Sequence, residues 1–516
     1  MDSSISPPIL SQLSTLIEAW TGLYFPPDRW SDLERRIEAA APAFGCADAD
    51  TCARLLVSSP LTKHQIELLA SHLTVGETYF FREHRSFEVL EEHILPRLLD
   101  ARRGAEQRLR IWSAACCTGE EPYSIAMLLS RAMPDLPAWH TTILASDISP
   151  RFLQKAAEGM YGQWSFRSVP GWIHERYFCK TADGRFAIQS SLKQMVSFAQ
   201  LNLAADVYPA LSTNTNAMDV IFCRNVLIYF TAERARRVIE HLYHALVDGG
   251  WLIVSPVETA YVLESPFVPV QFPGVTLFHK DLQHPTPYTV GASAVFAPLS
   301  PALPDTAFQP DVSVPLLTDA PAAVSTQAVH DGTAHHERPE PYHEPRLTPY
   351  EEARALYAHG RYSEAVAKLL ELCTATQAQP NVQGGAREQE MALLARAYAN
   401  QGQLAEAQAW CENAITVNKL NPGLHYLRAI ILLERGQTVE ARLSLTRSLY
   451  LEQNLVLAHF ALGNLARQQK EFKEADKHFE NALTLLRGYR PDEILPESEG
   501  ITAGRLAQII AAMTTR

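Results

Sequence analysis

The chain has 516 residues, 47% of them hydrophobic, and a formal net charge of −12 at pH 7. This length is enough for several domains with buried cores, and an acidic chain without a basic stripe argues against DNA or RNA as a partner. No apolar run approaches the roughly 20 residues of a membrane span, and the opening residues lack the positive charge of a signal peptide. We therefore expect a cytoplasmic protein without direct membrane insertion.

Two domains are expected in the first half of the chain. Residues 1–72 carry apolar side chains at helical spacing, which predicts a small helical domain: Leu13, Leu16, Ile17 and Trp20. Residues 73–283 alternate apolar strands with amphipathic helices, which predicts an α/β fold with a parallel sheet flanked by helices.

The most informative motif of the second domain follows its first apolar strand. The strand Leu109–Ala115 leads into residues 118–124, Thr-Gly-Glu-Glu-Pro-Tyr-Ser, which predicts a tight turn and the start of a helix. Phosphate-binding turns use repeated glycines and usually a lysine, whereas this turn has one glycine and two glutamates. We therefore expect a ligand that is cationic or rich in hydroxyl groups, with Glu120 against its amine or its hydroxyls.

Two later strands also end in polar residues. The strand in 141–149 ends at Asp147, and an acid at the tip of the second strand of a doubly wound fold accepts hydrogen bonds from ribose hydroxyls. The apolar run that begins at Met218 leads into Arg224 and Asn225. Ligands of open parallel sheets bind at the carboxyl ends of the strands, so these segments predict one site at that edge.

The remaining strands complete the expected sheet. Residues 251–254 form a further strand, and residues 275–280 are expected to form an antiparallel final strand. Between about 172 and 200, short alternating strands around the turn 181–185 predict a small antiparallel β-subdomain.

The C-terminal part is expected to be a linker followed by a repeat array. Residues 284–346 are rich in Pro, Ala, Thr and Ser without periodicity, which is typical of a disordered linker. Its histidines have no fixed geometry, so we predict no metal site: His330, His335, His336 and His343.

Residues 347–490 carry an internal repeat, and residues 491–516 are expected to form a helical tail. Alanines at 407, 441 and 475 recur at 34 residues, the tetratricopeptide period, and an inserted loop between 377 and 387 explains the longer interval from Ala365. Such arrays present a concave groove, so we expect a protein partner there.

Four motifs in order resemble the CheR-type chemoreceptor glutamate O-methyltransferases over roughly residues 10 to 282. They are residues 74–83 (TVGETYFFRE), 118–124 (TGEEPYS), 202–203 (NL) and 223–230 (CRNVLIYF). The resemblance implies a Rossmann-like sheet that binds S-adenosylmethionine and releases S-adenosylhomocysteine. It also implies a methyl acceptor, a glutamate on the cytoplasmic helical domain of a chemoreceptor.

The resemblance also implies roles for individual residues. Thr78 and Arg82 would contact the methionine end of the cofactor, with Arg82 paired to its carboxylate. The adenine and methionine regions would be framed by Asn202, Leu203, Arg224 and Asn225. Tyr229 would position the acceptor carboxylate and Arg97 would neutralise it, although Tyr229 also fits a core aromatic and Arg97 a solvated helix charge.

Three further features bear on the contacts to the cofactor and on how the acceptor is reached. Many relatives have Asn where this chain has Gly76, so a side-chain contact is missing there. Family members that capture a receptor's C-terminal peptide by strand addition have a longer, glycine-rich hairpin loop, whereas the loop around Gly184 is short. A basic cluster is either a solvated face or a dock for an acidic receptor helix: Arg29, Arg35 and Arg36.

The chemistry needs no general base, because a glutamate carboxylate is already an anion at neutral pH. Alignment and desolvation are expected to dominate. Two alternatives to receptor methylation remain: a tetratricopeptide scaffold that senses the cofactor without turnover, and a methyltransferase that acts on another carboxylate.

Overall fold

The computed structural model describes most of the chain, in eight segments. They are residues 5–103, 107–205, 207–210, 213–281, 348–377, 384–491, 493–498 and 501–514. The expected linker 284–346 and part of the expected loop 377–387 lie outside the described residues. No helix among these segments is long and apolar enough to cross a membrane.

The N-terminal segment folds into four helices. They are α1 (Pro7–Thr21), α2 (Trp30–Ala40), α3 (Ala49–Ser58) and α4 (Lys63–Leu73). Local capping fixes where the helices begin, because the side chain of Asp48 accepts from the Thr51 N–H and Thr62 forms a capping box with Gln65. Helix α1 is followed by Gly22, whose φ of 81° favours glycine.

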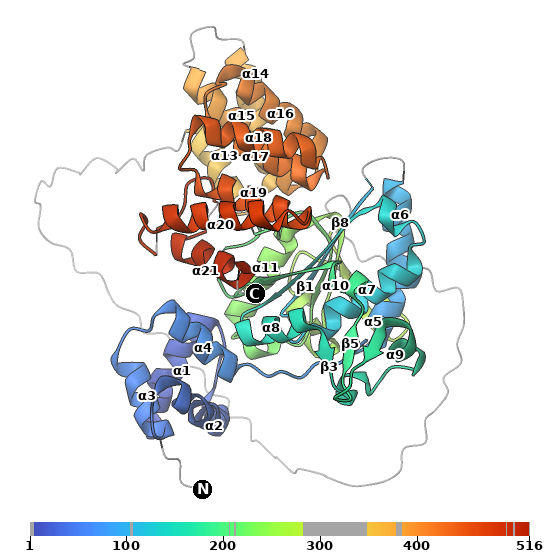
Figure 1. Ribbon diagram of the computed structural model, residues 1–516, viewed down its shortest axis with the longest axis vertical. Helices are drawn as coiled ribbons and strands as arrows, with labels where there is room; N and C mark the ends of the chain where they lie inside the picture. Colours follow the sequence, from blue (N-terminus) through green and yellow to red (C-terminus); the bar gives the residue numbers. More distant parts are fainter. Residues whose placement is uncertain are drawn as a thin grey trace, which may run out of the picture. The chain divides into compact units, whose positions relative to one another are not determined.

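A seven-stranded sheet forms the centre of the following domain (Figure 1), with the order β6-β2-β1-β7-β8-β10-β9. The strands are β1 (Arg108–Ala114), β2 (His140–Asp147), β6 (Val196–Gln200), β7 (Met218–Cys223), β8 (Leu246–Ile253), β9 (Val268–Phe272) and β10 (Val275–His279). Strands β6, β2, β1, β7 and β8 pair in parallel, whereas β10 is antiparallel to both β8 and β9. The predicted parallel sheet and its antiparallel strand at 275–280 are confirmed.

The helices of this domain connect the strands and cover the sheet. They are α5 (His84–Val89), α6 (Leu95–Arg102), α7 (Glu120–Ala132), α8 (Pro150–Glu158), α9 (Trp172–Tyr177), α10 (Ser190–Lys193), α11 (Ala232–Ala245) and α12 (Thr259–Leu263). Short helical segments lie between some of them: η3 (Leu90–Ile94), η4 (Leu136–Ala138), η5 (Gln163–Phe166), η6 (Leu227–Tyr229) and η7 (Pro256–Glu258). Two more lie in the N-terminal segment, on either side of α2: η1 (Pro27–Arg29) and η2 (Ala41–Phe44).

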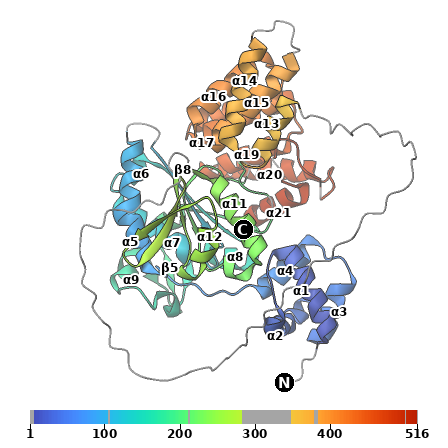
Figure 2. The same cartoon turned by 180° about the vertical axis from the view of Figure 1, so that it is seen from behind.

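Strand β1 is buried on both faces, and its side chains alternate between two cores. Trp112 and Ala114 belong to one core, together with α11 and the N-terminal helices. Leu109 and Ile111 belong to the other core, together with α7. Figure 1 shows α7 and α11 flanking the sheet, and Figure 2 shows α11 and α12 from behind.

A small antiparallel sheet lies in the segment between β2 and β6. Its order is β3-β5-β4, with β3 (Met160–Tyr161), β4 (Phe178–Lys180) and β5 (Phe186–Ile188). The turn between β4 and β5 is closed by the Thr181 N–H, which donates to the Arg185 carbonyl at 2.9 Å, and Gly184 has a φ of 79°. The predicted antiparallel subdomain is therefore confirmed, with three-residue strands at its hairpin.

The described residues of the C-terminal part form nine α-helices and one isolated β-bridge between Ile494 and Thr502. The helices are α13 (Pro349–Ala358), α14 (Tyr362–Gln377), α15 (Gly384–Asn400), α16 (Leu404–Val417), α17 (Pro422–Glu434), α18 (Thr438–Leu451), α19 (Val456–Gln468), α20 (Phe472–Leu486) and α21 (Ala503–Thr514). Small residues recur in the first turn of every second helix and are at most 2% exposed: Ala365, Ala407, Ala441 and Ala475. Pairs of helices approach closely at these alanines, as the repeat pattern predicts.

The turns inside the helix pairs share one backbone conformation. Gly402 and Gly436 have φ values of 77° and 71°, and Lys470 occupies the equivalent place with a φ of 64°. A residue with a Cβ costs roughly 1 to 2 kcal/mol in this left-handed region. The last turn is therefore strained by its side chain.

Replacing Lys470 by glycine is expected to stabilise the last helix pair by about 1 kcal/mol, because glycine relieves this strain. Hydrogen exchange of the α19 and α20 amides in the whole chain measures the effect. Lys477→Gly is the matched control. Lys477 is an exposed residue inside helix α20, where glycine is expected to destabilise the helix by about 1 kcal/mol. Faster amide exchange in Lys470→Gly would show that the Lys470 side chain does not strain this turn.

Candidate functional site

A pocket lies at the carboxyl ends of the central strands, where the strand order reverses between β1 and β7. It is lined by residues that follow β1, β2, β6 and β7 and by residues of the N-terminal segment. Such a reversal leaves a crevice outside the sheet edge, which is where ligands of open α/β sheets bind.

Asp147 stands at the end of β2 and lines this pocket. Its carboxylate accepts from the Cys117 N–H and the Ser149 N–H, both at 2.9 Å. Burial raises the pKa of Asp147 to about 6, although these backbone donors oppose the shift. The remaining lone pairs of a carboxylate at this place suit ribose hydroxyls.

The turn after β1 decides which glutamate reaches the pocket. Glu121 lines it, and its carboxylate accepts from the Ser113 hydroxyl at 2.7 Å and lies 3.3 Å from the Arg224 guanidinium. Glu120 is absent from the lining and instead accepts from the hydroxyls of Thr118 and Ser165 at 2.7 and 2.9 Å. In this structure Glu121 therefore lines the pocket, whereas the predicted Glu120 does not.

The physical reason is the geometry of the first helical turn. Successive residues of an α-helix point about 100° apart, so only one of two adjacent glutamates faces the ligand. Left-handed backbone at Ala115, Cys117 and Gly119, with φ values of 62°, 51° and 95°, sets that orientation. Burial raises the pKa of Glu121, and the Arg224 guanidinium opposes this shift.

Arg224 follows β7 and is almost fully buried in the pocket wall. Its guanidinium donates to the Arg82 carbonyl and forms ion pairs with Glu83 at 3.1 Å and with Glu121 at 3.3 Å. Arg224 therefore joins three segments of the wall: the motif at 74–83, the start of α7 and the end of β7.

The expected methionine-end residues Thr78 and Arg82 both line the pocket. The Arg82 guanidinium donates to the Glu77 carbonyl at 2.7 Å. A Cβ at Gly76 would meet the Phe152 ring at 3.1 Å, so the space of a side chain at 76 is filled by an aromatic residue that lines the pocket.

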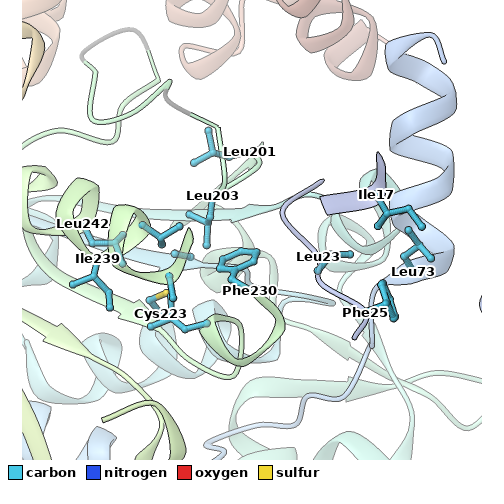
Figure 3. Packing of buried hydrophobic residues seen from close by; sticks show 14 of the residues in the cluster. Ile17, Leu23, Phe25, Leu73, Leu201, Leu203, Cys223, Phe230, Ile239 and Leu242 are labelled. Atoms are coloured by element: carbon cyan, nitrogen blue, oxygen red, sulfur yellow. The ribbon is translucent and has the colours of Figure 1, made fainter. Parts of the chain in front are cut away.

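Asn202 and Leu203 follow β6 and line the pocket where it meets the N-terminal helices. The Asn202 amide donates to the Trp20 carbonyl at 3.3 Å, and its oxygen accepts from the Ala204 N–H at 2.9 Å. Leu203 belongs to the hydrophobic core that joins α11 to the N-terminal helices. Figure 3 shows Leu203 and Phe230 on one side of this core and Leu23 on the other.

Tyr229 lines the pocket together with Asn225 from the same loop. The Tyr24 N–H donates to the Tyr229 carbonyl at 2.8 Å, which ties the loop to the N-terminal segment. The Arg29 guanidinium lies 5.9 Å from the centre of the Tyr229 ring, and Arg36 lines the pocket beside it. Burial lowers the pKa of Arg36.

Two of the arginines considered from the sequence lie elsewhere. Arg97 is an exposed residue of α6 and is not among the pocket-lining residues. Arg35 is also outside the lining, and its guanidinium pairs with Asp32 on the exposed face of α2. The structure therefore does not bring Arg97 to the site, and Arg29 and Arg36 stand near Tyr229 instead.

The site combines an apolar wall with groups of both charges. Phe152, Leu201, Leu203 and Phe230 offer apolar contacts for a planar base, while Asp147 and Glu121 offer acceptors for hydroxyls or an amine. The sequence did not predict that Glu121, Phe152, Arg29 and Arg36 line the pocket. Only Glu121 had a local signal, its position in the 118–124 motif.

Comparisons with known families match two regions of the chain. Residues 76–271 match the family described as CheR methyltransferase, SAM binding domain. Residues 391–419 and 458–492 match families described as tetratricopeptide repeats.

Curated relatives match less than half of the chain. Chemotaxis protein methyltransferase 2 of Vibrio cholerae is 37% identical over 246 residues, 44% of this chain and 83% of the relative. Chemotaxis protein methyltransferase 1 of Pseudomonas aeruginosa is 37% identical over 215 residues, 40% of this chain and 76% of the relative. A probable chemotaxis protein methyltransferase of Rhizobium etli is 36% identical over 203 residues, 39% of this chain and 74% of the relative.

Proposed function

The chain belongs to the CheR methyltransferase family, and we propose that it methylates glutamate side chains on the cytoplasmic helical domain of a chemoreceptor, with S-adenosylmethionine as donor. One observation carries the proposal: a single pocket holds buried Asp147 at the end of β2 and Tyr229 with Arg29 at the N-terminal wall. Groups suited to a nucleoside and groups suited to a carboxylate would thus share one cavity.

S-adenosylmethionine supplies an electrophilic methyl group on a sulfonium. Asp147 would accept from the ribose hydroxyls, Glu121 from the amine, and Arg82 would pair with the methionine carboxylate. The buried apolar residues Leu203 and Phe230 would hold the adenine and would exclude water from that side.

The acceptor carboxylate would enter beside Tyr229. Its oxygen forms a bond to the methyl carbon as the bond to sulfur breaks, and the bonding electron pair stays on sulfur. No proton moves in this step, so Tyr229 and Arg29 would act by orienting the carboxylate and by lowering its desolvation cost.

Transfer of labelled methyl from S-adenosylmethionine to a panel of purified chemoreceptor cytoplasmic domains tests the proposal. We expect label on receptor glutamates and base-labile release as volatile methanol, since an ester hydrolyses in base. Binding of S-adenosylhomocysteine without label on any receptor would favour the scaffold alternative. Label on small carboxylic acids alone would favour the other alternative.

Deleting a receptor's C-terminal peptide is expected to leave the methylation rate unchanged. The edge strand β4 has only three residues, and the hairpin turn is closed tightly by Thr181 and Arg185, so it offers little for strand addition. Initial rates on full-length and peptide-deleted receptor measure the effect. A rate that falls tenfold or more on the shortened receptor contradicts this prediction.

Removing residues 347–516 is expected to preserve methylation of purified receptor and to impair it in the cell. The repeats have hydrophobic cores of their own, and a repeat array that binds a partner near the receptor would raise the local enzyme concentration. Paired assays in solution and in vivo measure the two effects. A truncated chain that binds cofactor but is inactive on purified receptor would place the repeats in the catalytic unit.

A further inference from the structure

A buried carboxylate that does not line the pocket holds the loop that carries Tyr229. Glu258 is the last residue of η7, which follows β8, and its side chain is fully buried. The pocket-lining residues do not include it. Its role is therefore to be found in its contacts with the protein.

Three consecutive backbone N–H groups of the loop donate to this carboxylate. The N–H groups of Asn225, Val226 and Leu227 lie 2.7 Å from the Glu258 oxygens. Ser255 adds two more donors, its N–H at 3.1 Å and its hydroxyl at 2.5 Å. Five donors compensate the burial of one charge, which is otherwise very unfavourable.

The loop conformation fits an anion and not merely a tight turn. Asn225 has a left-handed φ of 57°, and Val226 returns to a negative φ of −126°. Successive N–H groups in such a sequence converge into a concave nest that binds anions. Glu258 fills this nest from η7, so the loop takes its shape from a residue more than thirty positions away.

The residues on both sides of this nest in the chain line the pocket. Arg224 precedes it and Tyr229 ends it, and both line the pocket. The Tyr229 N–H donates to the Val226 carbonyl at 3.1 Å, so Tyr229 is tied directly to a residue held by Glu258. A shift of residues 225–227 would therefore move the Tyr229 ring.

We propose that Glu258 is a positioning residue for methyl transfer, which sets the place of Tyr229 by organising the backbone of residues 225–227. The proposal rests on the proposed function for its kinetic consequence, whereas its structural consequence holds for the protein without any substrate. Glu258→Gln tests it, because the amide replaces one acceptor oxygen with a donor that opposes the loop N–H groups.

The first measurement does not depend on methyltransferase activity. Fluorotyrosine is incorporated into the whole chain, and the Tyr229 fluorine resonance is identified by its loss in Tyr229→Phe. We expect this resonance to shift or broaden in Glu258→Gln and to stay in place in Glu264→Gln. Glu264 is the control because it follows α12 in the same segment and its side chain is 76% exposed.

The second measurement is a double-mutant cycle on turnover at saturating S-adenosylmethionine. Glu258→Gln is expected to lower turnover at least tenfold in the unaltered chain and less than threefold in Tyr229→Phe, because coupled residues are not additive. Affinity for S-adenosylhomocysteine is expected to fall by a smaller factor than turnover, because Asn225 of the same loop also lines the pocket. A merely structural role would lower turnover equally in both backgrounds.

Each outcome decides a separate question. Chains that transfer no methyl to receptors refute the proposed function, and the fluorine resonance still decides the role of Glu258. An unshifted resonance in Glu258→Gln, or equal losses in both backgrounds, overturns the proposal. If Glu258→Gln does not fold, Ser255→Ala replaces it, since this variant removes only the hydroxyl donor, and an unshifted Tyr229 resonance there overturns the proposal as well.

Discussion

Replacing Asp147 by asparagine is expected to weaken S-adenosylhomocysteine binding at least tenfold at pH 7.5. The carboxylate at the end of β2 is the acceptor we assign to the ribose hydroxyls, and hydrogen bonds to charged groups contribute roughly 1.5 to 3 kcal/mol. Calorimetric titration measures the dissociation constant. An unchanged constant contradicts the assignment.

The same variant is expected to remove a pH dependence of cofactor binding. Because the pKa of Asp147 is raised to about 6, only roughly one-tenth of the protein carries the carboxylate at pH 5. Ribose hydroxyls donate to the ionised form, so affinity in the unaltered chain should fall about tenfold from pH 7.5 to pH 5. Glu121 also has a pKa raised by burial, and a dependence that persists in Asp147→Asn would point to Glu121 instead.

The sign of the stability effect follows from the direction of the shift. A carboxyl whose pKa is higher in the folded than in the unfolded protein favours folding while it is protonated, and this contribution is lost as the pH rises from about 4 through about 6. Because the ribose hydroxyls donate to the ionised carboxylate, the rise in unfolding temperature caused by S-adenosylhomocysteine should grow as the pH rises through about 6. Asp100→Asn, on the exposed side of α6, is the matched control and should not alter either pH profile.

Replacing Tyr229 by phenylalanine is expected to lower methyl transfer ten- to a hundredfold and to leave S-adenosylhomocysteine affinity within about twofold. The ring lies in the pocket beside Arg29, and the phenol is the group that we expect to orient the acceptor carboxylate. A loss confined to turnover identifies an interaction made during the reaction rather than in cofactor binding. Single-turnover rates and calorimetry separate the two.

The control for Tyr229 is Tyr261→Phe. Tyr261 lies on α12, packs against the same core and does not line the pocket, so both quantities should stay near those of the unaltered chain. Equal losses of turnover and affinity in Tyr229→Phe would make this residue part of the cofactor site or of the core.

Residues predicted from strand ends reached the pocket, whereas residues predicted from helices did so unevenly. Asp147 and Arg224 follow buried parallel strands, and parallel strands bring their carboxyl ends to one edge wherever they lie in the chain. Glu120 and Arg97 lie on helices, where orientation depends on the rotation of the helix and on what covers it. The Glu120 side chain accepts from the Ser165 hydroxyl and does not line the pocket, and the Arg97 side chain is exposed.

The sequence by itself determined the order of the elements, the parallel sheet, the acid at the end of β2 and the 34-residue period of the repeats. The reason is that the spacing of apolar residues within one helix, strand or repeat can be seen in a short stretch of sequence. Only the tertiary structure decided that Glu121 faces the pocket, that Arg29 and Arg36 from the N-terminal segment line it, and that Glu258 holds the Tyr229 loop. These features depend on left-handed backbone positions and on packing between distant segments. Neither leaves a periodic signal in the chain, so folding alone brings these groups together.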